Sequence, residues 1–279
     1  MLRTAPALAA VLLLAACAGD TAGPSAPAAE SAPQVDAALA AAVAAPHRTV
    51  EQRARDAHRH PVESLAFWGL KPGATVMEIG PGEGWWTEIL APYAARTGGR
   101  YIMALGTSPA AETFAAHYRA NPALYGDFGR ATFTGQAGLT APANSVDLIL
   151  VARAFHNWAG QEGVTDRAMS SFAAALKPGG VLAVEQHRAP EGADPKAGTG
   201  YVPESYVIEA AKRAGLVLDA RSEINANPAD TRNHPFGVWT LPPVRRAEQN
   251  GRTLTAEERA RYDAIGESDR MTLRFRKPA

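Results

Sequence analysis

The sequence predicts an α/β fold: a doubly wound, mainly parallel sheet of seven strands, with an antiparallel last strand and an insertion before it. Three observations predict this fold. Short apolar, β-branched runs alternate with segments of helical periodicity between residues 76 and 224. A glycine-rich turn follows the first run. No helix of ordinary crossover length separates the last two runs, so we expect those two strands to pair antiparallel.

The elements follow one another in a regular order. Strands are predicted at residues 76–79, 100–105, 131–134, 146–152, 181–186, 216–224 and 271–275. Helices are predicted at residues 85–95, 109–118, 165–176, 203–214 and 255–265, with one or two more within 49–68. The strand at 146–152 is apolar almost throughout, as is typical of a parallel strand buried on both faces. The insertion, about residues 226–268, is longer than a structureless loop should be and is expected to have a function.

Composition limits the class of protein. The chain has 279 residues, of which 46% are hydrophobic, so it is long enough to bury one sizeable core. Its 28 basic and 28 acidic residues balance, which argues against a nucleic-acid partner. We expect one domain at residues 47–279, and no pattern in it specifies an oligomeric state.

The N-terminus has the form of an export signal. Arg3 precedes an apolar run at residues 7–16 that is too short to span a bilayer, which predicts a signal peptide at residues 1–16. The run ends in Leu14-Ala15-Ala16-Cys17 and resembles a bacterial lipoprotein lipobox, in which Cys17 becomes the lipidated N-terminus. The alternative is a plain secretory peptide in which Cys17 is incidental. The lipobox resemblance implies a lipid-anchored periplasmic protein, held at the membrane, most simply the outer membrane.

Residues 17–46 are rich in Ala and Pro and are expected to form a disordered tether. Within them, residues 35–45 are rich in Ala, and we expect that a helix there would have too few large apolar side chains to dock. Because Cys17 is the only cysteine, an intrachain disulfide is excluded.

The turn after the first predicted strand has the residues expected of a ligand-binding site. Gly80, Gly82 and Gly84 remove side chains where the backbone must bend sharply and approach a ligand. Glu78 ends the strand, and its carboxylate is expected to point toward that ligand. A carboxylate favours a cation or hydroxyl and amine donors over a pyrophosphate.

Several segments together resemble the class I S-adenosylmethionine-dependent methyltransferases over about residues 51–277. They are the glycine turn, the strand at 146–150, the Leu-Lys-Pro-Gly-Gly turn at 176–180 and the last pair of strands. Residues 155–158, 185–188 and 234–239 are similar to a poorly characterised family of bacterial methyltransferases, exported or lipid-anchored.

The resemblance implies that the cofactor, S-adenosylmethionine, lies across the carboxyl ends of the central strands. Glu78 is then expected near its amino or sulfonium charge. The acidic residue that relatives use for the ribose is replaced here by Leu105 or Gly106, and Gln136 falls on the adenine position. The implied cofactor contacts are Glu78, Gly80, Pro81, Gly82, Gly84, Leu105, Gly106, Gln136 and Arg153.

Candidates for catalysis follow the strand ends. His156 and Asn157 come after the fourth predicted strand and His187 after the fifth, where relatives place groups that contact the substrate. A histidine has a suitable pKa for accepting a proton from the methyl acceptor. Helix capping or core hydrogen bonding is the structural alternative for His156 and Asn157. No metal site is expected at His58, Arg59, His60 and Glu63, because Pro61 interrupts their helical spacing; a solvated face is expected there instead.

The predicted function is therefore that of an enzyme that transfers a methyl group from S-adenosylmethionine to a small acceptor. One alternative is an exported binding protein that has kept the fold and lost turnover. A second is a nicotinamide-dependent oxidoreductase, which is disfavoured because the acid expected about twenty residues beyond the glycine turn is absent.

Overall fold

The sheet has the predicted strands in a doubly wound order. In a computed structural model of the chain, which describes residues 1–2 and 36–279, the strand order is β4-β3-β2-β1-β5-β6-β12-β8. The strands that were predicted are β1 (Thr75–Ile79), β2 (Arg100–Leu105), β3 (Gly129–Thr134), β5 (Val146–Ala152), β6 (Leu176–Ala189), β8 (Val217–Ser222) and β12 (Arg270–Arg276). Two short strands were not predicted: β4 (Gly138–Thr140) at the sheet edge and β7 (Val202–Pro203) beside β6.

The pairing confirms the predicted fold class. Strands β1, β2, β3, β5 and β6 pair in parallel, whereas β12 lies antiparallel between β6 and β8. The turn at residues 177–180 falls where the register between β5 and β6 shifts. Because the parallel strands share one direction, their carboxyl ends meet at one edge of the sheet.

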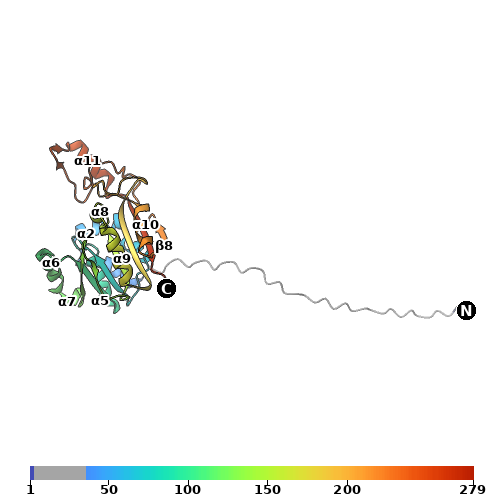
Figure 1. Cartoon of the computed structure of the whole chain (residues 1–279). Coiled ribbons are helices and arrows are strands. Elements are labelled where there is room, and N and C mark those ends of the chain that lie inside the picture. The colour runs from blue at the N-terminus through green and yellow to red at the C-terminus, as the bar shows by residue number, and fades with distance from the viewer. Residues whose placement is uncertain (3–35) are drawn as a thin grey trace. The chain divides into compact units, whose positions relative to one another are not determined.

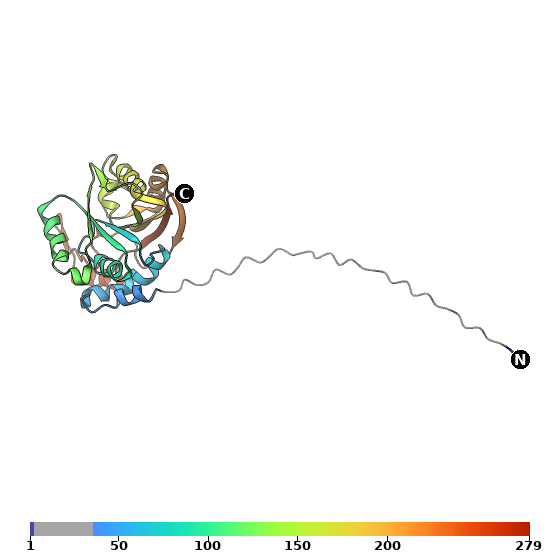
Figure 2. The same ribbon diagram turned by 90° about the horizontal axis from the view of Figure 1, so that it is seen from below.

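Helices cover both faces of the sheet, as the turned views show (Figures 1 and 2). One buried cluster joins the sheet to α9 (Val164–Ala175) and α10 (Glu204–Arg213). The other joins its opposite face to α1 (Ala37–Val43), α4 (Pro61–Phe67), α5 (Thr87–Thr97) and α6 (Pro109–Arg119). Shorter helices are α2 (Val50–Ala54), α3 (Asp56–Arg59), α7 (Pro122–Tyr125) and α8 (His156–Ala159).

The insertion is ordered and has elements of its own. It contains β9 (Pro235–Val238), a hairpin of β10 (Glu248–Gln249) with β11 (Arg252–Thr253), and α11 (Ala256–Ile265). A capping box formed by Thr255 and Glu258 begins α11, which confirms the helix predicted at residues 255–265. Figure 1 shows α11 at the end of the domain where α8 follows β5, so the insertion lies at the carboxyl edge of the sheet.

The predicted boundary of the domain at residue 47 is wrong. Helix α1 is capped by Asp36 and packs its buried Leu39 and Ala42 against α5 and α4. The Tyr93 hydroxyl donates a hydrogen bond to Asp36 over 2.5 Å. One leucine among alanines therefore suffices for docking here, because a close helix–helix contact needs little side-chain volume.

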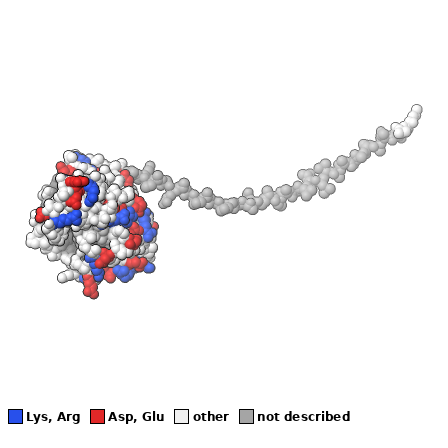
Figure 3. Space-filling model, turned by 90° about the horizontal axis from the view of Figure 1, so that it is seen from above, with Lys and Arg blue, Asp and Glu red and all other residues white. Residues whose placement is uncertain are grey.

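The predicted signal peptide, Cys17 and the first part of the tether lie outside the described residues. Among the described residues, no helix is long and apolar enough to cross a membrane. On the face shown in Figure 3, basic and acidic side chains are interspersed.

Candidate functional site

A cavity opens at the carboxyl edge of the sheet, between the glycine turn and the insertion. Its volume is about 280 Å³, close to the lower end of the range for sites that bind small molecules. Its walls come from α2–α3, the ends of β1, β5 and β6, the insertion and the segment before β12. The sequence-predicted residues that line it are Glu78, Gly80, Pro81, Gly82, Arg153, His156, Asn157 and His187.

The glycine turn presents bare backbone to this cavity. Gly80 and Gly82 have φ values of 60° and 61°, a left-handed conformation that strains other residues. A Cβ atom added at either position would meet no atom within 4 Å. Gly84 differs, because an added Cβ would lie 2.0 Å from the Tyr118 hydroxyl. Gly84 therefore serves packing against α6 and does not line the cavity, contrary to the prediction.

Glu78 lines the cavity from the end of β1, and its carboxylate is held firmly. Thr87 and Tyr101 donate hydrogen bonds to its Oε2 atom over 2.7 and 2.6 Å. Burial raises the pKa of Glu78 to about 7, although these two hydrogen bonds and the charge of Arg153 act in the opposite direction. Glu78 is thus poised between its neutral and charged forms at neutral pH, and a cationic ligand would favour the charged form.

Arg153 follows β5 in a left-handed backbone conformation, with φ 53°. Its main-chain N–H donates to the Glu185 carbonyl over 2.6 Å, which fixes the residue at the cavity wall. Its side chain forms no hydrogen bond or ion pair with the described residues, and its Nε atom is buried without a partner. Burial lowers the pKa of this guanidinium.

His156 and His187 lie together on the cavity wall, with ring centroids 5.6 Å apart. Burial is the main cause that lowers the pKa of both, so both are neutral at pH 7. The Nδ1 atom of His187 is 2.5 Å from the Ser268 hydroxyl, which leaves its Nε2 atom for other contacts. Asn157 is exposed at the rim, at the start of α8. The structure thus brings all three predicted catalytic residues to one cavity.

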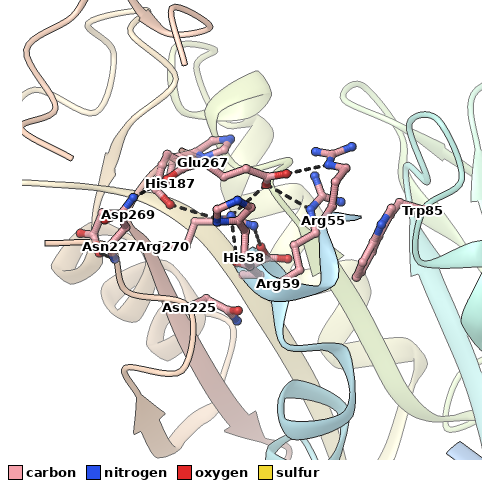
Figure 4. A network of polar contacts seen from close by, with 12 residues as sticks. Arg55, His58, Arg59, Trp85, His187, Asn225, Asn227, Glu267, Asp269 and Arg270 are labelled. Carbon is pink, nitrogen blue, oxygen red and sulfur yellow. Dashed lines mark hydrogen bonds and ion pairs between the residues drawn. The ribbon is translucent and has the colours of Figure 1, made fainter. Parts of the chain in front are cut away.

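A network of buried ion pairs supports the cavity from the side of α2–α3 (Figure 4). Glu267 accepts from Arg55 over 2.6 Å, from Arg59 over 3.2 Å and from Arg270 over 2.9 Å. Arg270 also donates to Glu185 over 2.6 Å. The network ties the N-terminal helices to β12 and β6.

Arg59, which the sequence interpretation assigned to a solvated face, is instead fully buried over the Trp85 ring, 4.6 Å from its centroid. Among the described residues, no group of three or more His, Cys, Asp or Glu side chains is arranged to hold a metal ion.

Three predicted cofactor contacts do not line this cavity: Leu105, Gly106 and Gln136. The carbonyl groups of Leu105 and Gly106 accept hydrogen bonds from Arg130, which also pairs with Glu112 over 2.8 Å. Backbone oxygens and an arginine thus stand at the end of β2, where the resemblance implies an acidic residue.

The sequence interpretation missed the part of the site that the insertion contributes. Trp239, Pro242 and Pro243 form an apolar wall, and Glu267 and Ser268 add polar groups. The similarity of residues 234–239 to a family of bacterial methyltransferases is the one sequence signal for this part of the site. Glu267 and Ser268 carry no local pattern that marks them.

The sequence matches the methyltransferase domain family over residues 50–227, more than half of the chain. No curated protein matches the sequence.

Solved structures show the same fold. A candidate methyltransferase in complex with the Haloferax volcanii Trm112 methyltransferase activator is 20% identical, with a TM-score of 0.51 over 88% of this chain and 99% of that chain. A candidate sarcosine dimethylglycine methyltransferase from Galdieria sulphuraria is 15% identical, with a TM-score of 0.53 over 83% and 89%. The [4+2]-cyclase SpnF is 20% identical, with a TM-score of 0.56 over 86% and 92%. At these identities the likeness concerns the fold alone.

Proposed function

Because the chain belongs to the methyltransferase domain family, we propose that it is an enzyme that transfers a methyl group from S-adenosylmethionine to a small acceptor. One observation carries this proposal. The side-chain-free bend at Gly80 and Gly82 borders the same cavity as the carboxylate of Glu78. A bend of this kind admits a ligand close to the backbone, and the neighbouring carboxylate favours a positively charged one.

The residues of the cavity suit the methionine end of this cofactor. Glu78 would face its amino or sulfonium charge. The buried Nη2 atom of Arg55, which has no partner in the described part of the chain, would suit its carboxylate. At the ribose end, Leu105 and Gly106 offer no acidic side chain for the two hydroxyl groups. The lack of a charged hydrogen bond there is expected to weaken binding about ten- to a hundredfold.

Side chains of the cavity would then accept the proton that the methyl acceptor loses. When bound, S-adenosylmethionine supplies a methyl group on a sulfonium sulfur, which keeps the bonding electron pair as the methyl group moves to the acceptor. His187, neutral and oriented by Ser268, would accept the proton that the acceptor loses, with His156 as its neighbour. Asn157 at the rim would contact the acceptor. Holding the acceptor in line with the methyl group would supply most of the remaining rate acceleration.

Calorimetric titration of S-adenosylmethionine into the full chain tests cofactor binding. We expect saturable binding that weakens about tenfold or more in Glu78→Gln and is unchanged in Glu209→Gln, a control at an exposed glutamate on α10. Conversion to S-adenosylhomocysteine in the presence of a panel of small acceptors then tests turnover. Binding without conversion of any acceptor would favour the binding-protein alternative, and binding of a nicotinamide cofactor instead would favour the oxidoreductase.

We also propose that the chain is exported and lipid-anchored in the bacterial periplasm through Cys17. The Leu-Ala-Ala-Cys sequence at the end of the apolar run supports this proposal. Mass spectrometry of the protein purified from a bacterial membrane fraction is expected to show a lipidated N-terminal Cys17, and Cys17→Ser is expected to release the protein from that fraction. An intact N-terminus at Met1 would contradict the proposal.

A further inference from the structure

In the wall of the cavity, the side chain of Arg153 forms no ion pair with any described residue, although Glu185 and Glu267 lie near enough for their charges to act on it. Each carboxylate near it already has other partners. Both oxygens of Glu185 are used, by Arg270 and by Trp86, and both oxygens of Glu267 accept from arginines of the network. Oε2 of Glu78 accepts from two hydroxyl groups. Three arginines thus share two buried carboxylates before Arg153 is counted, and the site carries excess positive charge.

Two guanidinium groups that line this cavity have nitrogen atoms without a partner among the described residues: Arg55 at Nη2 and Arg153 at Nε. S-adenosylmethionine has only one carboxylate. The second guanidinium therefore calls for an anion from another molecule, since Arg153 is half-buried with its Nε atom out of contact with solvent, and an unpaired cation is costly to keep there.

The surroundings of Arg153 favour the acceptor as the source of that anion. The charge of Arg153 contributes to lowering the pKa of both His156 and His187, after burial as the main cause, so it lies close to the histidine pair. An anionic group on Arg153 would hold its molecule beside these two bases. On the insertion side, Trp239 and Pro242 offer an apolar surface to the rest of that molecule.

We propose that the methyl acceptor is a small organic carboxylate with an apolar, ring-sized body, whose carboxylate group pairs with Arg153 and whose body packs against the insertion. This inference rests on the proposed methyl transfer for its meaning, although the anion site itself does not. It reassigns Arg153, which the sequence placed among the cofactor contacts. A single unpaired guanidinium matches the charge and the planar fork of a carboxylate better than a phosphate dianion.

Calorimetry with benzoate as the probe tests the anion site. Benzoate is titrated into the full chain, both alone and saturated with S-adenosylhomocysteine, and compared with its neutral isostere benzamide and with phenyl phosphate. We expect benzoate to bind, benzamide to bind at least tenfold more weakly, and phenyl phosphate to bind more weakly than benzoate. Absence of benzoate binding at millimolar concentration overturns the proposal, as does tighter binding of benzamide or phenyl phosphate.

Three variants assign the effect to Arg153. Arg153→Gln is expected to weaken benzoate about ten- to a hundredfold, the loss of one charged hydrogen-bonded contact, and to leave the affinity for S-adenosylhomocysteine unchanged within threefold. Arg153→Lys keeps the charge and is expected to retain most of the benzoate affinity, which also shows that the site tolerates substitution. Arg213→Gln removes an exposed arginine paired with Asp166 and is the control for net charge.

The outcome for the cofactor separates the two proposals. If Arg153→Gln weakens S-adenosylhomocysteine but not methylthioadenosine, which lacks the carboxylate, Arg153 binds the cofactor and the inference is wrong. If the wild-type chain binds benzoate through Arg153 but binds neither S-adenosylmethionine nor its product, the anion site stands and the proposed methyl transfer fails.

Discussion

Charged side chains are paired with one another in the ion-pair network around Glu267, whereas those in the neighbouring cavity wall are not. In the ion-pair network around Glu267, three arginines from distant segments share carboxylates and hold α2–α3 against β12. At the cavity wall, burial raises the pKa of Glu78 to about 7, and the side chain of Arg153 has no partner among the described residues. Charges in the first region stabilise the fold. Those in the second are costly to it unless a ligand compensates them, which supports that wall as the proposed binding surface.

Replacing a Glu by Gln in each region tests this difference most directly. The larger change in the free energy of unfolding is expected in the ion-pair network. Glu267→Gln leaves Arg55 and Arg59 without a carboxylate and Arg270 with only Glu185. We expect the free energy of unfolding to fall by about 3 to 5 kcal/mol, because uncompensated buried cations remain. Denaturant unfolding followed by circular dichroism measures the change. A loss below 1 kcal/mol would mean that the network does not hold the N-terminal helices in place.

At the cavity wall the ionised glutamate lowers the free energy of unfolding instead of raising it. The pKa of Glu78 rises from 4.5 to about 7 on folding, and each pKa unit corresponds to about 1.4 kcal/mol, so ionised Glu78 destabilises the ligand-free fold by about 3 kcal/mol above pH 7. This cost is absent below pH 4.5, where the carboxyl is protonated in both the folded and the unfolded state, and it grows between pH 4.5 and 7.

Glu78→Gln is therefore expected to stabilise the ligand-free protein by up to about 3 kcal/mol at pH 8 and little at pH 5. The amide oxygen of glutamine can still accept from Thr87 and Tyr101. Thermal unfolding at both pH values measures the difference between variant and wild type. Equal destabilisation at both pH values would show that Glu78 belongs with the structural charges.

Cofactor affinity gives a smaller and more specific effect. If S-adenosylmethionine requires ionised Glu78, its affinity for the wild type relative to Glu78→Gln should rise about tenfold between pH 6 and pH 8, since the pKa of Glu78 is about 7. Taking the ratio to the variant cancels the titration of the ligand itself. A ratio that does not change with pH would remove Glu78 from the cofactor site.

The smallest effect is expected at Ser268. Ser268→Ala removes the hydroxyl group that is 2.5 Å from His187 Nδ1. We expect a loss of about 1 kcal/mol in stability, the usual contribution of one hydrogen bond, and a melting temperature lower by about 2 to 4 °C. Differential scanning calorimetry measures both. No change would mean that packing alone fixes the His187 ring.

The difference between the two regions also explains what the sequence could predict. The strands and the bend at Gly80 and Gly82 were predictable because hydrophobic periodicity and glycine placement are local signals. Ion pairs are not local. Arg55 and Glu267 are 212 residues apart in the chain, and neither residue is marked by its neighbours.

Local signals also misled at particular positions. Gly84 has the spacing of a cofactor contact, yet it makes room for the Tyr118 hydroxyl. Helix α1 has one leucine among alanines and a valine, and its docking depends on the surface that α5 offers. Both outcomes are decided by tertiary packing, which no window of the sequence contains.

A crystal structure of the full chain grown with S-adenosylhomocysteine is the most direct test of the central claim. Its homocysteine portion is predicted to lie over the backbone of Gly80 and Gly82, with its amino group facing Glu78. Density for the ligand elsewhere, or a side chain of this chain filling the space above these two glycines, would contradict the account.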